Sequence, residues 1–260
     1  MTTVSIVIPM RNEAPNAERV LRGVAEACAD VAHEIIAVDD GSDDGTGAAL
    51  LALAENLPQL RVLAHAESAG QSAAIHTGVR AARSPIICTM DGDGQNPAHE
   101  LPRLYGPLLE GSASLGLVAG QRVARKDTLS RRLASRAANA IRRRALGDGT
   151  RDTGCGLKAF RRDAFLALPY FNHMHRYLPA LFARDGWGIL LVDVAHRERF
   201  AGRSNYTNLQ RALVGVHDLI GVAWLIRRGA RARVLPEGTA PAPSRAPAAA
   251  PTPAPVERRA

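Results

Sequence analysis

Three polar side chains, Asp91, Asp93 and Gln95, follow the apolar run 85–90 at alternate positions. Two carboxylates and an amide carbonyl supply hard oxygen atoms, which Mg²⁺ and Mn²⁺ prefer as ligands. A magnesium ion held by so few protein groups keeps several waters and bridges to the phosphates of a substrate. The spacing therefore predicts a cation site that serves a phosphate-bearing ligand. An acidic turn that merely closes a strand remains the alternative for an isolated D-x-D.

A calcium-binding EF-hand loop fits neither acidic stretch of the chain. Counted from Asp91, the loop would need glycine at Asn96 and glutamate at Pro102. Counted from Asp40, it would need glutamate at Leu51. We therefore expect a magnesium- or manganese-type site and no calcium loop.

The chain has 260 residues and a formal net charge of +8, which is enough length for one large α/β domain or two small ones. The positive charge predicts attraction to nucleic acid, anionic lipid or phosphorylated substrates, and does not choose among them. Three scattered cysteines, Cys28, Cys88 and Cys155, form neither a metal pattern nor a disulfide framework, which favours a reducing compartment. We see no signal peptide and no apolar run of the roughly 20 residues that a spanning helix needs. We therefore expect a cytoplasmic protein.

Apolar runs alternate with amphipathic segments along the first part of the chain. The expected elements are, in chain order, strand 4–9, helix 14–30, strand 34–38, helix 46–55, strand 60–64, helix 71–82, strand 85–90, helix 97–109 and strand 114–120. This alternation predicts an α/β fold whose central, mostly parallel sheet is flanked by helices. Right-handed crossovers would bring the polar strand exits at Pro9, Asp39 and Asp91 to one edge of the sheet.

The remainder of the chain is less regular. We expect a basic helix over 127–146, helices around 162–168, 176–184 and 207–228, and a strand over 188–194. The composition then shifts to Ala, Pro and Arg, and this low-complexity end is expected to be disordered. The predicted organisation is a single domain over 1–228, with halves 1–121 and 122–228, followed by a tail over 229–260.

Several segments match one family in order and spacing. They are Ser5-Ile6-Val7-Ile8-Pro9-Met10-Arg11-Asn12-Glu13, Val38 to Thr46, Gly70-x-x-x-Ala74-x-x-x-Gly78, Asp91-Gly92-Asp93-Gly94-Gln95, Asp152 to Lys158 with Phe160-Arg161, His175 to Pro179, and Arg199-x-x-Gly202-x-Ser204-x-Tyr206. Together they resemble family-two glycosyltransferases with a GT-A fold, most closely the dolichyl-phosphate mannosyltransferase-like branch, which glycosylates polyprenyl phosphates. The resemblance covers about residues 4–228. It implies a nucleotide-sugar-binding fold and metal-dependent, inverting transfer of a sugar from a GDP- or UDP-linked donor to a polyprenyl phosphate.

The resemblance also implies which residues hold the donor and the cation. The nucleotide-sugar would contact Pro9, Arg11, Glu13, Asp39, Asp40, Gly70, Gln71, Asp91, Gly92, Arg199 and Arg203. The cation, Mg²⁺ or Mn²⁺, would be bound by Asp93 and Gln95, and the catalytic residues would be Asp91, Asp93 and Asp152. Structural alternatives remain open: Glu13 could simply begin a helix, and the small residues at 70, 74 and 78 could pack on the sheet instead of a ligand.

The acceptor phosphate would lie against the basic segment 122–144. Its expected contacts are Arg122, Arg131, Ser135 and, from a later helix, Arg176. A guanidinium group binds phosphate through paired hydrogen bonds, and a serine hydroxyl adds a further donor. The alternative is a solvated basic face or a face against anionic lipid.

Polyprenyl phosphate lies in a membrane, so the resemblance implies a protein that reaches the cytoplasmic face of a bilayer. The apolar segment 213–226, with Trp224 and the arginines that follow, could lie in the bilayer interface. Packing on the domain as a core helix is the alternative. We expect peripheral attachment, aided by an integral membrane partner.

Three rival functions use the same residues. A related transferase acting on a saccharide or other soluble acceptor would need a general base to ionise a hydroxyl, and Asp152 is the candidate. A non-enzymatic lipid- or nucleic-acid-binding protein would use the basic segment, but acidic strand exits repel polyphosphate, so we expect no nucleic acid partner. A dinucleotide-dependent oxidoreductase would need a glycine-rich turn after the first strand, which this sequence lacks.

Overall fold

The structure of the protein, a computed structural model, describes residues 2–111, 113–123, 142, 144, 146–147, 149–197 and 208–229, and only the backbone of 208–214. Four expected site residues, Arg131, Ser135, Arg199 and Arg203, lie outside the described residues. So do most of the expected basic helix and the expected tail beyond Gly229. The predictions made for these segments stay predictions.

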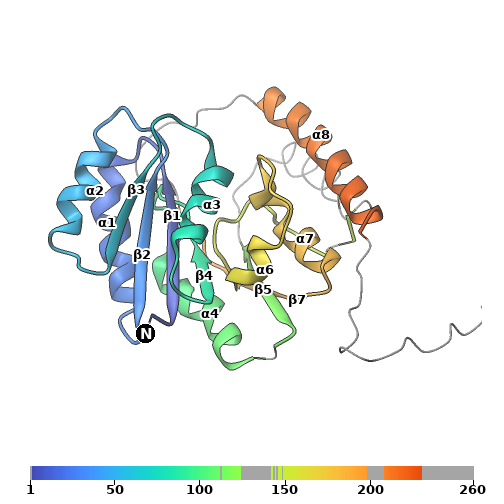
Figure 1. The fold of residues 1–260 in the computed structure, drawn as a ribbon, viewed down its shortest axis with the longest axis horizontal. Helices are drawn as coiled ribbons and strands as arrows, with labels where there is room; N and C mark the ends of the chain where they lie inside the picture. The colour runs from blue at the N-terminus through green and yellow to red at the C-terminus, as the bar shows by residue number, and fades with distance from the viewer. Residues whose placement is uncertain are drawn as a thin grey trace, which may run out of the picture. The chain divides into compact units, whose positions relative to one another are not determined.

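Strands and helices alternate along the chain as the sequence predicts (Figure 1). The described elements are β1 (Val4–Met10), α1 (Ala14–Ala27), β2 (His33–Asp39), α2 (Thr46–Ala54), β3 (Leu60–Ala64), α3 (Gln71–Ala81), β4 (Ile86–Thr89), the 3-10 helix η1 (Ala98–Glu100), α4 (Leu101–Glu110), β5 (Leu115–Arg122), β6 (Lys158–Arg161), α6 (Arg162–Leu166), the 3-10 helix η2 (Met174–Arg176), α7 (Leu178–Arg184), β7 (Gly188–Val194) and α8 (Asn208–Arg227). The ends of the expected elements differ from these bounds by a few residues at most.

The strands form one seven-stranded sheet in the order β3-β2-β1-β4-β6-β5-β7. Neighbouring strands are parallel except at β6, which runs antiparallel to both β4 and β5. The α/β fold with a mostly parallel sheet is therefore confirmed. The register sets Met10 opposite Asp39, and Thr89 opposite Lys158. Because β6 runs the other way, its first residue lies where the parallel strands end, along an edge that we call the rim.

The sequence analysis missed the strand β6. Its four residues, Lys-Ala-Phe-Arg, begin and end with a charged side chain and contain no β-branched residue. The strand pairs with a neighbour on each side, and Ala159 and Phe160 are fully buried. Pairing on both edges thus overrides a weak local preference for extended structure.

Helices pack on both faces of the sheet, because successive side chains of a buried strand point to opposite sides (Figure 1). On one face Ile6 and Ile8 share a core cluster with residues of α1, α2 and α4, and on the other Val7 shares one with residues of α3, α6, α7 and α8. The helical glycine Gly78 faces Val7, since a Cβ at this position would overlap the valine side chain. Packing on the sheet therefore explains this glycine.

Asp40, the residue after β2, connects two loops of the rim. Its carboxylate accepts the amide N–H groups of Ala69 and Gly70, each at 2.9 Å, and the hydroxyl of Ser68 at 2.8 Å, and it lies 2.8 Å from His65 Nδ1. Burial alone would raise the pKa of Asp40, but these hydrogen bonds hold it below its ordinary value. The expected contact of Asp40 with a nucleotide stays a prediction, and its two oxygens already have partners within the chain.

We expect Asp40→Asn to lower the free energy of unfolding by about 2 kcal/mol near neutral pH, because hydrogen bonds to a charged group are worth roughly 1.5–3 kcal/mol. A depressed pKa means that ionised Asp40 stabilises the fold above its unfolded-state pKa of about 3.9, and that this stabilisation is lost as the pH falls through the folded-state pKa. The difference from wild type should therefore shrink below about pH 4. Urea unfolding across this range measures it, with the exposed Asp43→Asn as control. A difference that is the same at every pH would contradict this role for Asp40.

Candidate functional site

The exit of β4 carries the first part of the candidate site. Asp91 Oδ1 accepts a hydrogen bond from Gln71 Nε2 at 2.7 Å, and Asp91 Oδ2 accepts one from Asn96 Nδ2 at 3.2 Å. Burial raises the pKa of Asp91 and the charge of Asp93 raises it further, while the charge of Lys158 acts in the opposite direction. The two carboxylates therefore repel each other, and a cation bound beside them would relieve that repulsion.

Two glycines give the strand exits their close packing. A Cβ at Gly156 would overlap the carboxylate carbon and both oxygens of Asp91. A Cβ at Gly92 would come within 2.8 Å of Met10 Cγ and 3.0 Å of the Pro9 carbonyl oxygen. The loop after β4 thus packs directly on the exit of β1, where contacts with the donor were expected, and a side chain at either glycine would displace its neighbour.

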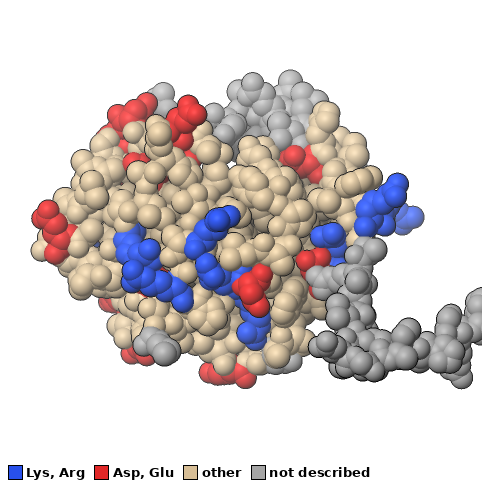
Figure 2. Space-filling model, viewed as in Figure 1, with Lys and Arg blue, Asp and Glu red and all other residues tan. Residues whose placement is uncertain are grey.

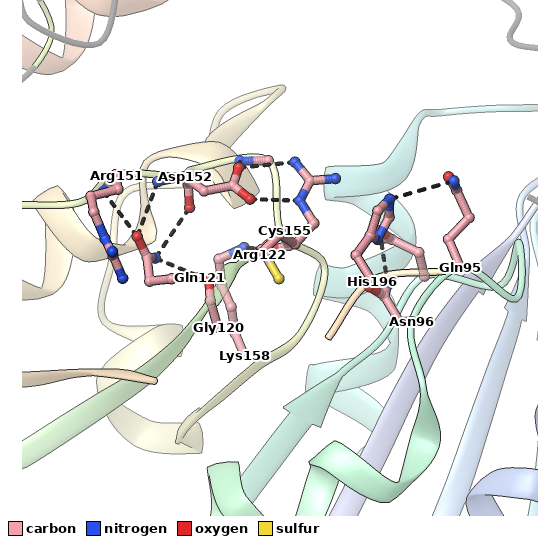
Figure 3. Close-up of polar contacts among 12 residues, drawn as sticks. Gln95, Asn96, Gly120, Gln121, Arg122, Arg151, Asp152, Cys155, Lys158 and His196 are labelled. Carbon is pink, nitrogen blue, oxygen red and sulfur yellow. Dashed lines mark hydrogen bonds and ion pairs between the residues drawn. The ribbon is translucent and has the colours of Figure 1, made fainter. Parts of the chain in front are cut away.

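Asp93 and Gln95 form a tight turn that meets the segment following β7. Asp93 Oδ1 accepts the amide N–H of Gln95 at 3.1 Å. Gln95 Nε2 lies 3.5 Å from His196 Nε2, and the carbonyl of Gln95 accepts the amide N–H of Arg197 at 2.9 Å. Figure 3 shows the side chains of Gln95 and His196 pointing toward each other. The sequence analysis missed His196, whose signal was a polar pair of residues just after an expected strand.

These side chains fit a magnesium- or manganese-type ion. Asp93 and Gln95 supply oxygen atoms, and the imidazole of His196 lies beside them. Within the part of the chain that the structure describes, no three His, Cys, Asp or Glu side chains are grouped so that they could hold a metal ion by themselves. Mg²⁺ keeps several waters and binds through one or two carboxylates together with substrate phosphates, so an open set of ligands suits it. The repulsion between the carboxylates of Asp91 and Asp93 adds a reason for a cation to bind here.

The exit of β5 carries the second part of the site. Arg122 donates from Nε and Nη2 to the two carboxylate oxygens of Asp152 at 2.5 and 2.9 Å (Figure 3). Burial alone would lower the pKa of Arg122, but the hydrogen bonds and the charge of Asp152 raise it. An expected acceptor residue and an expected catalytic residue are thus brought together as an ion pair. A carboxylate paired with a guanidinium is a weak proton acceptor, which disfavours Asp152 as a general base.

A buried lysine at the start of β6 lies between these two parts. Lys158 donates from Nζ to the carbonyl of Cys155. Burial lowers the pKa of Lys158, and the negative charges of Asp91 and Asp152 act in the opposite direction. The sequence analysis gave Lys158 no role, because its place at the rim depends on the antiparallel direction of β6. The site therefore contains two basic side chains, Lys158 and Arg122, close to the carboxylates of Asp91 and Asp152.

The other expected donor residues lie around the exits of β1 and β2. Asp39 Oδ1 accepts the amide N–H and the hydroxyl of Ser42 at 3.0 and 2.5 Å. The Glu13 carboxylate accepts a hydrogen bond from Asn16 at 2.6 Å, and Arg11 is exposed. The structure thus places these side chains at the rim, and their contacts with a nucleotide stay predictions.

The N-terminus of α3 connects Asp91 to the segment that carries Arg176. Ser72 Oγ lies 2.7 Å from His175 Nδ1 and accepts the amide N–H of His175 at 3.3 Å. A Cβ at Gly70 would meet Asn172 Oδ1 at 3.5 Å. Burial holds the pKa of His175 well below its ordinary value, so this imidazole is neutral at physiological pH. Arg176, the next residue, is thus placed on the side of the rim where Gln71 reaches Asp91.

We expect Gly156→Ala to push the Asp91 carboxylate away from Gln71 and Asn96, because a side chain moves more easily than a strand. Binding of a nucleoside diphosphate with Mn²⁺ should weaken by about tenfold or more, while the melting temperature changes little. Titration calorimetry and thermal unfolding measure the two effects. The matched control is Gly106→Ala in α4, where a Cβ meets nothing within 4 Å. If both variants bind the nucleoside diphosphate with equal affinity, Asp91 does not contribute to its binding.

Comparison with known proteins shows the family of the chain. A family model described as glycosyl transferase family 2 matches residues 5–168. The chain is 35% identical over 211 residues to an undecaprenyl-phosphate 4-deoxy-4-formamido-L-arabinose transferase from Pectobacterium carotovorum, and 36% identical over 221 residues to one from Yersinia enterocolitica. These matches cover 80% and 84% of this chain. They cover 63% and 66% of the relatives, so the chain spans slightly less than two thirds of their length.

Two solved structures share the fold. Glucosyl-3-phosphoglycerate synthase from Mycobacterium tuberculosis, in complex with Mn²⁺, UDP-glucose and glycerol 3-phosphate, has a TM-score of 0.66 at 23% identity, covering 86% of this chain and 80% of that one. A mannosyltransferase from Pyrobaculum calidifontis, in complex with GDP-Man and Mn²⁺, has a TM-score of 0.61 at 22% identity, covering 87% and 65%. The predicted GT-A-type fold is confirmed. As its ordered motifs predicted, the chain belongs to glycosyl transferase family 2.

Proposed function

We propose that the protein transfers one sugar from a nucleotide-sugar to a polyprenyl phosphate and releases a nucleoside diphosphate, inverting the anomeric carbon. The observation that carries this proposal is that two neighbouring carboxylates, Asp91 and Asp93, lie at the same rim as the ion pair of Arg122 with Asp152. Lys158 and Arg122 lie close enough to Asp91 that their positive charges oppose the rise in its pKa that burial and Asp93 cause. The relatives, undecaprenyl-phosphate 4-deoxy-4-formamido-L-arabinose transferases, support a sugar donor and a polyprenyl-phosphate acceptor.

The donor would lie over the exits of β1, β2 and β4. Asp93 and Gln95, with His196 beside them, would hold Mg²⁺ or Mn²⁺, and such an ion neutralises the charge that develops on a departing diphosphate. Asp91, which two amide side chains hold in place, would contact the ribose or the ion. Asp39 would accept hydrogen bonds from the base or the ribose, because a carboxylate is an acceptor only.

The acceptor would approach from the exit of β5. A phosphate is already ionised near neutral pH, so its oxygen needs no general base to become a nucleophile. Arg122 contacts Asp152 through Nε and Nη2, so its third nitrogen, Nη1, is the one that would meet the acceptor phosphate. Arg131, Ser135 and Arg176 would complete this contact. Attack from the face opposite the diphosphate inverts the anomeric configuration.

The pairing of Asp152 weighs against the rival acceptor class. A saccharide or other hydroxyl acceptor would need a base, and Asp152 is bound through both of its oxygens to Arg122. A carboxylate in that position holds the guanidinium in one orientation, which suits an acceptor that arrives as a phosphate.

We expect Asp93→Ala to abolish Mn²⁺-dependent turnover while leaving the fold intact, because the cation would lose a carboxylate ligand and the donor its anchor. Release of nucleoside diphosphate in the presence of a polyprenyl phosphate measures turnover, and thermal unfolding checks the fold. Asp30→Ala, an exposed change in the turn between α1 and β2, is the control. Retained turnover would refute the metal assignment. Turnover of wild type with a soluble saccharide alone would favour the rival acceptor.

The helix α8 offers a surface for a membrane that holds such an acceptor. Val222 is buried against the domain, whereas Val216, Ile220 and Trp224 are 55%, 65% and 59% exposed. These three residues recur every fourth position and form one apolar stripe on the outer face. Arg227 and Arg228 stand where α8 ends, and Figure 2 shows basic side chains there. The helix therefore packs on the domain, which was the alternative expectation, and it also presents an apolar face to the outside.

None of the described helices is long and apolar enough to cross a membrane. An apolar stripe followed by basic residues is typical of helices that lie in a bilayer interface. We therefore propose peripheral attachment through α8 to the cytoplasmic face of the membrane that holds the acceptor, together with an integral membrane partner.

We expect the protein to float with anionic liposomes at moderate salt and Ile220→Glu to reduce the bound fraction several-fold, because a charge would enter the apolar stripe. Leu51→Glu is the matched control, since Leu51 is a 62% exposed leucine on α2, away from the stripe. Flotation followed by quantification of the bound fraction measures the effect. No association of wild type, or equal flotation of the two variants, would refute attachment through α8.

A further inference from the structure

One buried amide side chain, that of Gln121, connects β5 to the turn that carries Asp152. Gln121 is 1% exposed. Its Oε1 accepts the amide N–H groups of Arg151 and Asp152 at 2.9 and 3.0 Å. Its Nε2 donates to the carbonyls of Gly120 and Asp152 at 3.0 and 3.3 Å. Figure 3 shows these contacts beside the Arg122–Asp152 ion pair.

The pattern of these bonds needs an amide at this position. The backbone of the turn presents two N–H donors and one carbonyl acceptor to β5, and a primary amide supplies one acceptor atom and two donor hydrogens. A carboxylate would match the donors and repel the carbonyl, and an apolar side chain would leave buried backbone groups without partners.

Both the backbone and the side chain of Asp152 are consequently held in place. Gln121 fixes its backbone N–H and carbonyl, and Arg122 holds its carboxylate. The amide N–H of Gly154 also donates to Asp152 Oδ1 at 3.1 Å. An ion pair between Arg151 and Asp193 connects the same turn to β7. The orientation of the Arg122 guanidinium therefore depends on where this turn lies.

We propose that Gln121 is a positioning residue for the transfer reaction: it fixes the turn over 151–152 so that Arg122 and Asp152 keep one orientation beside Asp91. This inference rests on the proposed function. A misplacement of about 1 Å at a reacting site can cost about 100-fold in rate. Gln121 acts through its neighbours, so its loss affects the productive placement of the acceptor and leaves the donor contacts on β1, β2 and β4 in place.

A merely structural role would give a different result. The backbone of β5 is paired with β6 and β7 without help from the Gln121 side chain. The side-chain bonds of Gln121 reach the turn and its own neighbour, so removing them releases the turn and leaves the sheet intact. The matched structural control is Ser84, which is 1% exposed and donates to the Thr3 carbonyl at 2.5 Å. Ser84 lies just before β4, at the edge of the sheet opposite the rim.

The test compares Gln121→Met, which keeps the length of the side chain and removes its hydrogen bonds, with Ser84→Ala. Both variants should lower the melting temperature. Gln121→Met should also lower kcat with a polyprenyl phosphate by about 10- to 100-fold, with the Kd of the nucleotide-sugar in Mn²⁺ within about twofold of wild type. Amide hydrogen exchange should accelerate at 150–156 in Gln121→Met alone.

Two results would overturn the proposal. One is a kcat for Gln121→Met that equals that of Ser84→Ala at a temperature where both are folded. The other is unchanged exchange at 150–156. If wild type transfers no sugar to a polyprenyl phosphate, the proposed function fails and the positioning role in that reaction fails with it. Accelerated exchange confined to 150–156 would then still show that Gln121 holds the turn, so the two failures are distinguishable.

Discussion

Crowding of negative charge after β4 is the constraint on which the rest of the site depends. Asp91 and Asp93 stand two residues apart; burial raises the pKa of Asp91, and the charge of Asp93 raises it further. Lys158 and Arg122 offset part of this negative charge from within the chain, and burial is the main reason that the pKa of Asp91 stays above its ordinary value. An arrangement selected for stability alone would avoid such repulsion. A site that must bind a cation and release a charged product gains from compensation that is incomplete until the ligand arrives.

The antiparallel strand β6 is what makes this compensation available. In a fully parallel sheet every strand would present its last residues at the rim. Inserting β6 between β4 and β5 brings its first residue, Lys158, opposite Thr89. The same insertion carries the segment before β6 over the rim, where Gly156 lies against Asp91 and Asp152 meets Arg122. One reversal of strand direction thus brings together Lys158, the contact of Gly156 with Asp91 and the Arg122–Asp152 ion pair.

Local pattern predicted the α/β fold well, because the buried runs of β1 to β4 are apolar and are bounded by turn residues. It also placed Asp91, Asp93 and Gln95 correctly at a strand exit. Contacts between distant residues were beyond it: Arg122 and Asp152 are 30 residues apart and received separate roles.

The residues that sequence reasoning missed, His196 and Lys158, reach the site only through contacts between distant parts of the chain. Gln95 and His196 are 101 residues apart, and Lys158 reaches the rim only because β6 runs in the opposite direction to its neighbours. Asp40 illustrates the converse case. A carboxylate at a strand exit has the same local pattern whether it binds a nucleotide or the backbone of a neighbouring loop, and only the folded chain reveals the donors that surround Asp40.

The attachment of α8 to α7 also limits how the molecule could rest on a flat surface. Tyr177 donates to the carbonyl of Gly215 at 3.3 Å, and Arg184 donates to that of Leu225 at 3.2 Å. These two hydrogen bonds hold the backbone of the helix at two points and oppose rotation about its axis. The direction in which Ile220 faces is therefore locked to the catalytic body. A protein docked in this way would adopt a single tilt, and the height of its reaction centre above the lipid headgroups would be built into the molecule.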